Sequence, residues 1–200
     1  MKSKSSLIII TILLCAFYVS AQEFGSFTDS RDGKIYKTVK LGKQTWMAEN
    51  LAYKLNYGCW AYNDDENNVA TYGYLYNWET AKKACPPGWH LPSDEEWETL
   101  ITCLGSKRVA GGRMKECDTI HWKHPNDDAN NISGFSALPG GFRSGIGSYR
   151  NIRMTACWWS SSENDAGDVW VRALYYNNGK VDRNYDYFMR DGLSVRCIKD

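Results

Sequence analysis

The sequence predicts an α+β fold in which two helices lie among short antiparallel strands and long loops. Three observations support this prediction. Capped helix patterns begin at Asn77 and Ser93, alternating strand patterns lie near both ends of the chain, and neither a repeat nor a low-complexity linker divides the 200 residues. A chain of this length suits one domain, which buries roughly 70% of its unfolded surface.

The first 21 residues have the pattern of a signal peptide. Two lysines precede an apolar run over residues 7–19, which is shorter than the ~20 residues needed to span a bilayer. Small residues at Val19-Ser20-Ala21 predict cleavage before Gln22. An alternative is lipidation at Cys15, but the preceding Ile12-Leu13-Leu14 lacks the small residue expected there. We therefore expect a secreted or cell-surface protein with no transmembrane segment in its mature chain.

The charge balance gives no electrostatic reason to expect binding to nucleic acid or anionic lipid. The chain has 24 basic and 23 acidic residues, and the leader contains two lysines and no acid. The mature chain therefore has 24 − 2 = 22 basic residues against 23 acidic ones, a net charge of −1. No polybasic surface follows from such a balance.

The N-terminal third predicts a polar lead-in followed by two strands. Residues 22–32 form the lead-in. The next segment, 35–41, alternates: Ile35, Val39 and Leu41 share one face, and Tyr36, Thr38 and Lys40 share the other. This pattern is typical of a half-buried strand. Gly42-Lys43-Gln44 predicts a turn into a second strand over residues 45–47, and residues 56–72 read as loop.

Two helices follow in the sequence. Asn77 can cap the first, whose buried stripe is Trp78, Ala81 and Cys85, and Pro86-Pro87-Gly88 ends it. The second begins with a capping box at Ser93-Asp94-Glu95-Glu96. Its apolar face consists of Trp97, Leu100, Ile101 and Leu104, and Gly105 ends it.

The remaining chain predicts short strands and turns. Gly111-Gly112, Pro125-Asn126 and Pro139-Gly140-Gly141 mark turns. Segments 170–176 and 180–184 flank Asn177-Asn178-Gly179, which predicts a hairpin. A last strand over residues 193–198 places Leu193, Val195 and Cys197 on one face.

Six cysteines remain after the leader, and their even number in an exported protein predicts disulfides. Fifteen pairings are possible, and the sequence pattern alone leaves them open. No pair has metal-binding or redox spacing, so neither metal ligation nor a catalytic thiol is favoured.

Catalytic and metal motifs are weak. His90, His121 and His124 are the only histidines, and His90 is better explained as a packed structural residue before the second helix. We expect no catalytic residues, no enzymatic activity and no cofactor. Asp64, Asp65 and Glu66 form the densest oxygen-ligand cluster, but it lacks the glycine of a calcium-binding EF-hand loop. A solvated acidic turn explains the cluster better than calcium does.

The late hairpin and the residues after it are the best candidates for ligand binding. Tyrosine and asparagine supply large contact areas and adaptable hydrogen bonds, as in antibody loops. The candidates are Tyr175, Tyr176, Asn177, Asn178, Arg183, Asn184, Tyr185, Asp186 and Tyr187. An ordinary solvated hairpin explains them equally well. Trp158-Trp159 and Trp170 could stack on sugars, but core packing is the better explanation for them.

Several longer motifs resemble a known family. They are Trp46-Met47-Ala48-Glu49-Asn50-Leu51, Tyr72-Gly73-Tyr74-Leu75-Tyr76-Asn77-Trp78, Cys85-Pro86-Pro87-Gly88-Trp89-His90-Leu91-Pro92-Ser93, Gly134-Phe135-Ser136-Ala137-Leu138-Pro139-Gly140-Gly141-Phe142-Arg143, Trp158-Trp159-Ser160-Ser161-Ser162 and Gly192-Leu193-Ser194-Val195-Arg196-Cys197-Ile198-Lys199-Asp200. Together they resemble the Fibrobacter succinogenes major paralogous domain, a family of secreted and surface proteins common in Bacteroidetes and Fibrobacteres. The resemblance covers residues 33–200. It implies a C-type lectin-like fold, similar in layout to formylglycine-generating enzymes and retroelement-diversified binding proteins.

The resemblance also bears on the cysteines. In lectin-like folds the cysteine that ends the first helix commonly bridges to the last strand, which implies Cys85–Cys197. Cys103 and Cys117 flank the end of the second helix and would close a short loop, which leaves Cys59 with Cys157. Family members often have a local cysteine pair around Cys59, and here Cys59 has no such neighbour.

The expected function is non-enzymatic recognition of a glycan or protein ligand at or outside the cell surface. One alternative is a structural or assembly module of a bacterial surface complex. A second is an enzyme related to formylglycine-generating enzymes, although the sequence offers no convincing equivalent of their copper-holding cysteine pair.

Overall fold

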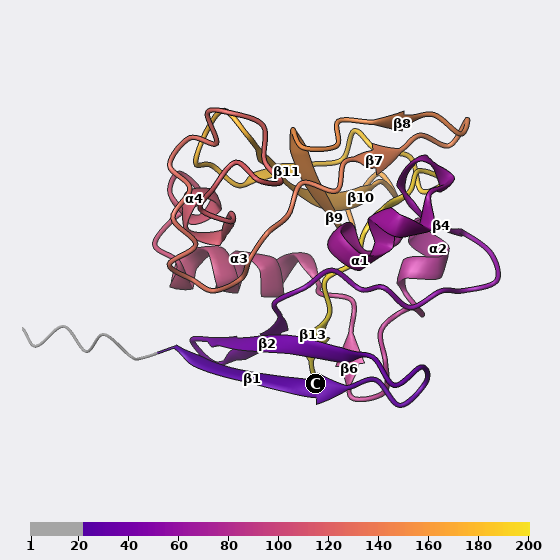
Figure 1. Ribbon diagram of the computed structural model, residues 1–200, viewed down its shortest axis with the longest axis horizontal. Helices are drawn as coiled ribbons and strands as arrows, with labels where there is room; N and C mark the ends of the chain where they lie inside the picture. The colour runs from indigo at the N-terminus through magenta and orange to yellow at the C-terminus, as the bar shows by residue number, and fades with distance from the viewer. Residues whose placement is uncertain (1–21) are drawn as a thin grey trace, which may run out of the picture.

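A computed structural model describes residues 22–200 and has an α+β architecture with mostly antiparallel strands. The predicted signal peptide and Cys15 lie outside the described residues. One sheet, with β1 and β2 at its edge, lies at one end of the molecule, and strands β7 to β11 lie at the other end, with α3 between them (Figure 1). None of the helices in residues 22–200 is long and apolar enough to cross a membrane.

The sheets are built from strands that are distant in sequence. The first has the order β1 (Glu23–Thr28), β2 (Ile35–Leu41), β3 (Gln44–Met47), β13 (Ile198–Lys199) and β6 (Trp89–His90). The second has the order β11 (Asp182–Asn184), β10 (Val169–Tyr175), β9 (Thr155–Glu163), β12 (Leu193–Ser194), β5 (Leu75–Tyr76) and β4 (Cys59–Trp60). A separate hairpin pairs β7 (Phe142–Arg143) with β8 (Tyr149–Arg150).

The described residues form four α-helices rather than two. They are α1 (Val69–Tyr72), α2 (Trp78–Ala81), α3 (Asp94–Cys103) and α4 (Ala110–Met114). Helix α2 has the predicted Asn77 cap but ends four residues before Cys85. Gly111 and Gly112, predicted as a turn, lie inside α4, where a Cβ at Gly111 would collide with the Lys180 carbonyl.

Helix α3 is capped as predicted. The Ser93 hydroxyl accepts a hydrogen bond from the Glu96 amide at 3.1 Å, and the Glu96 carboxylate accepts one from the Ser93 amide at 2.7 Å. Trp97, Leu100 and Ile101 are buried on the predicted face. Gly105 follows with a φ of 102°, a conformation that favours glycine. Local chemistry therefore decides where this helix begins and ends.

The predicted strand at residues 35–41 is present, but the burial of two of its side chains is the reverse of the prediction. Ile35 is 63% exposed, whereas Tyr36 is fully buried. The Tyr36 ring stacks on Phe27 with centroids 5.5 Å apart, and its hydroxyl accepts from the Ala52 amide at 3.0 Å. Phe27 belongs to β1, a strand within the predicted polar lead-in that pairs edge to edge with β2, and its ring covers part of Tyr36 on the face that the alternation assigned to solvent.

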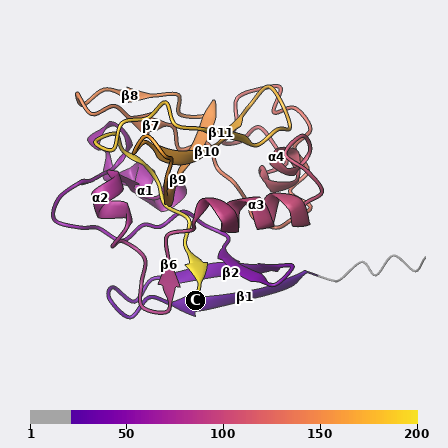
Figure 2. The same ribbon diagram turned by 180° about the vertical axis from the view of Figure 1, so that it is seen from behind.

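The last strand joins the two sheets. It divides into β12, which pairs with β5 and β9, and β13, which pairs with β3 and β6. Figure 2 shows this C-terminal segment running from the upper strands down to the lower sheet. Leu193, Val195 and Cys197 are buried in one hydrophobic cluster, as predicted, and Ile198 reaches the other.

Aromatic side chains fill the space between the sheets. The Trp97 ring lies 4.7 Å from that of Trp46 and 5.9 Å from that of Trp158, centroid to centroid. Trp158 and Trp159 have no exposed surface. The expected core packing of these two tryptophans is therefore confirmed, and neither ring is available to stack on a sugar.

One disulfide, Cys85–Cys197, is present among the described residues, as the resemblance implied. The expected Cys59–Cys157 bond is absent, and both thiols are free. These cysteines lie on β4 and β9 of one sheet, separated by β5 and β12. Three strand spacings amount to about 14 Å, beyond the reach of a disulfide.

Cys103 and Cys117 are also unbonded and exposed, which corrects the expected short loop. The residues between them fold into α4 instead. The Cys103 sulfur lies beside Gly42 in the β2–β3 turn, whereas Cys117 follows Lys115, which bridges to Ala137. Residues 22–200 therefore contain four free thiols, where the sequence predicted a fully paired set.

Candidate functional site

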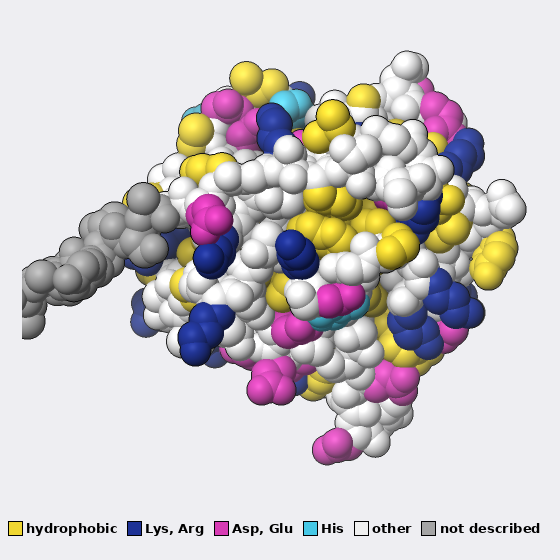
Figure 3. Space-filling view, turned by 90° about the horizontal axis from the view of Figure 1, so that it is seen from below, with side chains coloured by type: hydrophobic (Ala, Val, Ile, Leu, Met, Phe, Trp, Pro, Cys, Tyr) yellow, Lys and Arg dark blue, Asp and Glu magenta, His cyan; other side chains and the backbone are white. Residues whose placement is uncertain are grey.

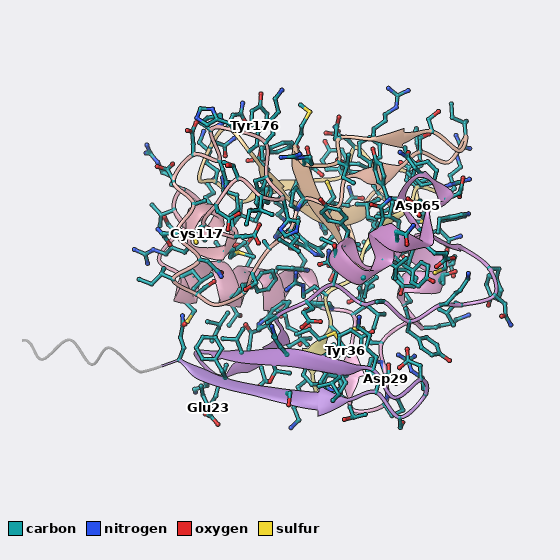
Figure 4. The ribbon with its side chains drawn as sticks, viewed as in Figure 1. Glu23, Asp29, Tyr36, Asp65, Cys117 and Tyr176 are labelled. Atoms are coloured by element: carbon teal, nitrogen blue, oxygen red, sulfur yellow. A yellow bond between two sulfur atoms is a disulfide. The ribbon has the colours of Figure 1, made fainter. Side chains whose placement is uncertain are left out.

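The nine predicted binding residues do not form one surface. The hairpin between β10 and β11 exists, but its register pairs Ala173 with Asp182, so its loop is wider than a tight turn at Asn177-Asn178-Gly179. Tyr176 packs partly against the core, and only Asn177 of the three residues 176–178 is exposed. Figure 4 shows Tyr176 at the end of the molecule opposite Tyr36 and Asp29.

A buried lysine holds this hairpin loop. Lys115 is fully buried, and its ammonium donates to the carbonyl oxygens of Asp127, Tyr175 and Asn178 at 2.7, 3.1 and 3.0 Å. Burial lowers the pKa of Lys115 to about 8. Sequence reasoning missed this residue because nothing in its neighbourhood marks a lysine as buried. One cation donates hydrogen bonds to three loop carbonyls, so the loop is fixed by a buried side chain.

Arg183 serves mainly as a structural residue. Its Nε and Nη2 donate to the Asp94 carboxylate at 3.0 and 2.9 Å, and its guanidinium lies 3.3 Å above the Trp170 ring. The Tyr185 ring contacts the same indole edge-on, with centroids 5.5 Å apart. Trp170 is therefore half-buried between two side chains and is not part of the core, unlike Trp158 and Trp159, so core packing was the wrong expectation for this residue.

Four of the predicted residues line a shared recess of about 450 Å³, which we call the late recess. Tyr175, Asn184, Asp186 and Tyr187 contribute to it from β10, β11 and the following segment. Sequence reasoning missed the rest of its wall, which comes from the β7–β8 hairpin and from residues after 187. These further residues are Phe142, Ser144, Gly145, Ile146, Asn151, Phe188, Arg190 and Asp191.

Hydrogen bonds connect the segments that form the walls of the late recess. The Asp191 carboxylate accepts from the amides of Gly145 at 2.6 Å and Phe188 at 2.9 Å, which ties the β7–β8 hairpin to the late segment. Tyr187 contacts the buried Cys157 thiol at 3.1 Å. The buried Asn184 Oδ1 has no hydrogen bond of normal geometry within residues 22–200. The contacts of Asp191 and Tyr187 hold the walls of the recess together.

Apolar side chains surround the mouth of the late recess. Phe188 and Ile146 are 66% and 81% exposed. The Phe142 ring meets the Tyr187 ring edge-on at 5.1 Å. Burial raises the pKa of Tyr175 to about 12, so its hydroxyl stays a neutral donor at physiological pH. Exposed apolar groups around a few polar ones are typical of a small-molecule site.

The acidic cluster does not converge on a metal position. Asp64 accepts from the Tyr149 hydroxyl, Asp65 accepts from the Asn67 amide, and Glu66 pairs with Lys54. Asp65 lies on the turn before α1 (Figure 4). Within residues 22–200, no group of three or more acidic, histidine or cysteine side chains could hold a metal ion. Asp64, Asp65 and Glu66, the candidate calcium ligands, therefore each contact a different partner.

His90 is more than a packed residue, because it lies between two carboxylates. Its Nδ1 is 2.6 Å from Asp200 and its Nε2 is 2.8 Å from Glu96. Partial burial opposes the charge, but the two hydrogen bonds outweigh it and raise the His90 pKa above its ordinary value of 6.5. The His90 ring links β6, the start of α3 and Asp200.

The His90 contacts predict a pH-dependent stability. Because the pKa is raised on folding, the contribution is complete below about pH 6.5 and is lost as the pH rises through the folded-state value. His90→Gln should abolish this change, which we expect to be ~0.2–1 kcal/mol because the group is partly exposed. Urea unfolding at pH 5.5 and 8.5 measures it. A matched His124→Gln variant should show the same change in unfolding free energy between the two pH values as wild type. An equal change in wild type and His90→Gln would contradict the assignment.

The other titratable groups offer little nucleophilic chemistry. Burial raises the pKa of the Cys157 thiol to about 12 and that of Cys59 to about 11, so neither is a thiolate at neutral pH. His121 is engaged with Glu116 at 2.9 Å. Its neighbour Trp122 is fully buried. On the face seen in Figure 3, acidic and basic side chains are interspersed around an apolar centre.

Comparison with known proteins gives a family match for this chain. A family model described as the Fibrobacter succinogenes major domain matches residues 39–199. No curated protein and no solved structure matches the chain. The match includes the late recess and the whole C-terminal strand, and it begins after β1.

Proposed function

The chain belongs to the Fibrobacter succinogenes major domain family, and from that premise we propose that it is a non-enzymatic recognition module that binds a glycan or protein ligand at the late recess. We further propose that it is exported through the leader at residues 1–21, and that its α+β architecture is C-type lectin-like. Helix α3, the long loops and the disulfide from Cys85 to the last strand support the fold assignment.

The observation that carries the proposal is the convergence of recognition-type residues on one recess. Tyr175, Asn184, Asp186 and Tyr187 meet there, although the sequence alone explained them equally well as a solvated hairpin. Aromatic rings offer flat apolar faces, and amide and carboxylate oxygens accept hydrogen bonds from hydroxyl groups. The exposed Asp186 carboxylate is one such acceptor.

The size of the late recess favours a glycan over a protein. A stable protein interface covers roughly 800 Å² on each partner and has a large apolar centre. A recess of about 450 Å³ instead matches a small ligand or one end of an oligosaccharide.

The titratable groups support a role other than catalysis. A nucleophile needs a base within hydrogen-bond reach and a third group that orients the base. In the described part of the chain, Cys157 contacts a tyrosine hydroxyl, and both His90 and His121 contact carboxylates. These contacts do not bring a nucleophile, a base and an orienting group together.

The proposal predicts loss of binding without loss of stability. Phe188→Ala combined with Ile146→Ala should abolish retention on a glycan array, because it removes the apolar mouth of the recess. Both side chains are mostly exposed, so unfolding free energy should change by only about 0.5 kcal/mol per site.

Tyr57→Ala with Ile120→Ala is the matched control, since these side chains are 71% and 70% exposed and lie outside the recess. It should bind as wild type. Full binding by the recess variant would contradict the proposal. A protein that binds neither an array glycan nor a protein partner would instead favour the assembly-module alternative.

A further inference from the structure

A second cavity, which we call the Arg196 cavity, lies between β2, α1 and the loop from residue 116 to residue 138. Its volume is about 450 Å³, and it shares no lining residue with the late recess. In Figure 1, α1 lies above β2 at the front of the molecule. Its lining includes Lys34, Lys37, Glu49, Glu116, Ser136 and Arg196.

Arg196 is a buried cation that has only neutral partners. It is 1% exposed, and its guanidinium makes four hydrogen bonds. Nη1 donates to the carbonyls of Met47 at 3.2 Å and Phe135 at 2.7 Å. Nε and Nη2 both donate to Asn50 Oδ1, at 3.2 and 2.8 Å. A guanidinium has five N–H groups, so one on Nη2 has no acceptor.

The missing counter-ion is costly for the protein. Removing a cation from water is unfavourable unless an anion and hydrogen bonds compensate. Burial lowers the pKa of Arg196 to about 9, and Glu49 is the acid that partly opposes this effect. An anion in the cavity would restore the missing half of an ion pair.

Two lysines add positive charge to the wall of the cavity. Neither Lys34 nor Lys37 belongs to an ion pair among residues 22–200, whereas Glu116 is occupied by His121. The lining thus has three cations against two carboxylates, one of which already has a partner. Glu49 and the Ser136 hydroxyl remain as acceptors for hydroxyl groups.

We propose that the Arg196 cavity binds a small acidic sugar, with the sugar carboxylate beside Arg196, Lys34 and Lys37 and its hydroxyl groups beside Glu49 and Ser136. The one Nη2 N–H of Arg196 that has no acceptor can donate a charge-assisted hydrogen bond to a carboxylate oxygen. The site is separate from the late recess and does not depend on the function proposed for that recess.

Calorimetric titration with sodium galacturonate tests this proposal. Galacturonate should bind, and neutral galactose should bind roughly tenfold more weakly or less, because hydrogen bonds to charged groups are the stronger ones. Lys37→Gln should weaken galacturonate binding roughly three- to tenfold. The matched control is Lys40→Gln, since Lys40 lies on the same strand, outside the cavity, and pairs with Glu23.

Arg196→Gln should abolish binding, and circular dichroism shows whether it folds. If it does not fold, Lys34→Gln with Lys37→Gln carries the test, because neither lysine is buried. The Phe188→Ala, Ile146→Ala variant should keep its galacturonate affinity, which separates this site from the late recess. The proposal is overturned by no binding of galacturonate, by equal binding of galactose or inorganic phosphate, or by equal losses in Lys37→Gln and Lys40→Gln.

Discussion

Replacing Trp97 with alanine should lower the free energy of unfolding by roughly 3–5 kcal/mol, the usual range for a buried tryptophan. Trp97 has no exposed surface and contacts the rings of Trp46, Phe135 and Trp158. Its removal leaves a cavity at the centre of the cluster between α3 and the two sheets. Urea denaturation of Trp97→Ala and wild type measures the difference.

Two variants control for other causes. Thr99→Ala lies on the exposed face of α3 and should change stability by about 0.5 kcal/mol or less. Trp97→Phe keeps an aromatic ring and removes an indole N–H that is buried without a hydrogen-bond partner in the described structure, so it should cost clearly less than alanine. A loss below 1 kcal/mol in Trp97→Ala would contradict the central position of this side chain.

Breaking the Cys85–Cys197 disulfide should cost about 4–5 kcal/mol. The two residues are separated by 112 positions, and the chain-entropy model assigns that much to a loop of this length. The bond also fixes the last strand, which pairs with both sheets. Thermal unfolding of Cys85→Ala with Cys197→Ala should therefore show a large fall in Tm.

Cys103→Ser with Cys117→Ser is the comparison, because both thiols are exposed and unbonded. That variant should keep the wild-type Tm and lose two titratable thiols. Peptide mapping that joins Cys85 to another cysteine, or an equal fall in Tm for both double variants, would refute the disulfide assignment.

The parts of the fold that could be predicted are those set by local chemistry. The Ser93 capping box and the apolar stripe of α3 depend on neighbouring residues, and both are confirmed. The Cys85–Cys197 bond followed from the family resemblance, and the family itself is confirmed. Burial along β2 depends on its pairing with β1 and on the packing of Tyr36 into the core, and alternation alone therefore placed Ile35 and Tyr36 wrongly.

The candidate site was predictable only in part for the same reason. Tyrosine and asparagine after the late hairpin indicated a binding region, and four of the nine residues do line one recess. The other wall comes from the β7–β8 hairpin, where the Gly145 amide donates a hydrogen bond to Asp191. Lys115 and Arg196 are charged residues buried by long-range contacts, and local sequence contains no signal for such burial.

The central claim is that ligand binds at the late recess, and NMR chemical-shift mapping with the tightest-binding array glycan tests it most directly. We expect the largest amide shifts in residues 142–151 and 184–191, with little change along β1 and in the acidic turn at residues 62–68. Shifts confined to β1 and β2, or spread evenly over the chain, would contradict recognition at this recess.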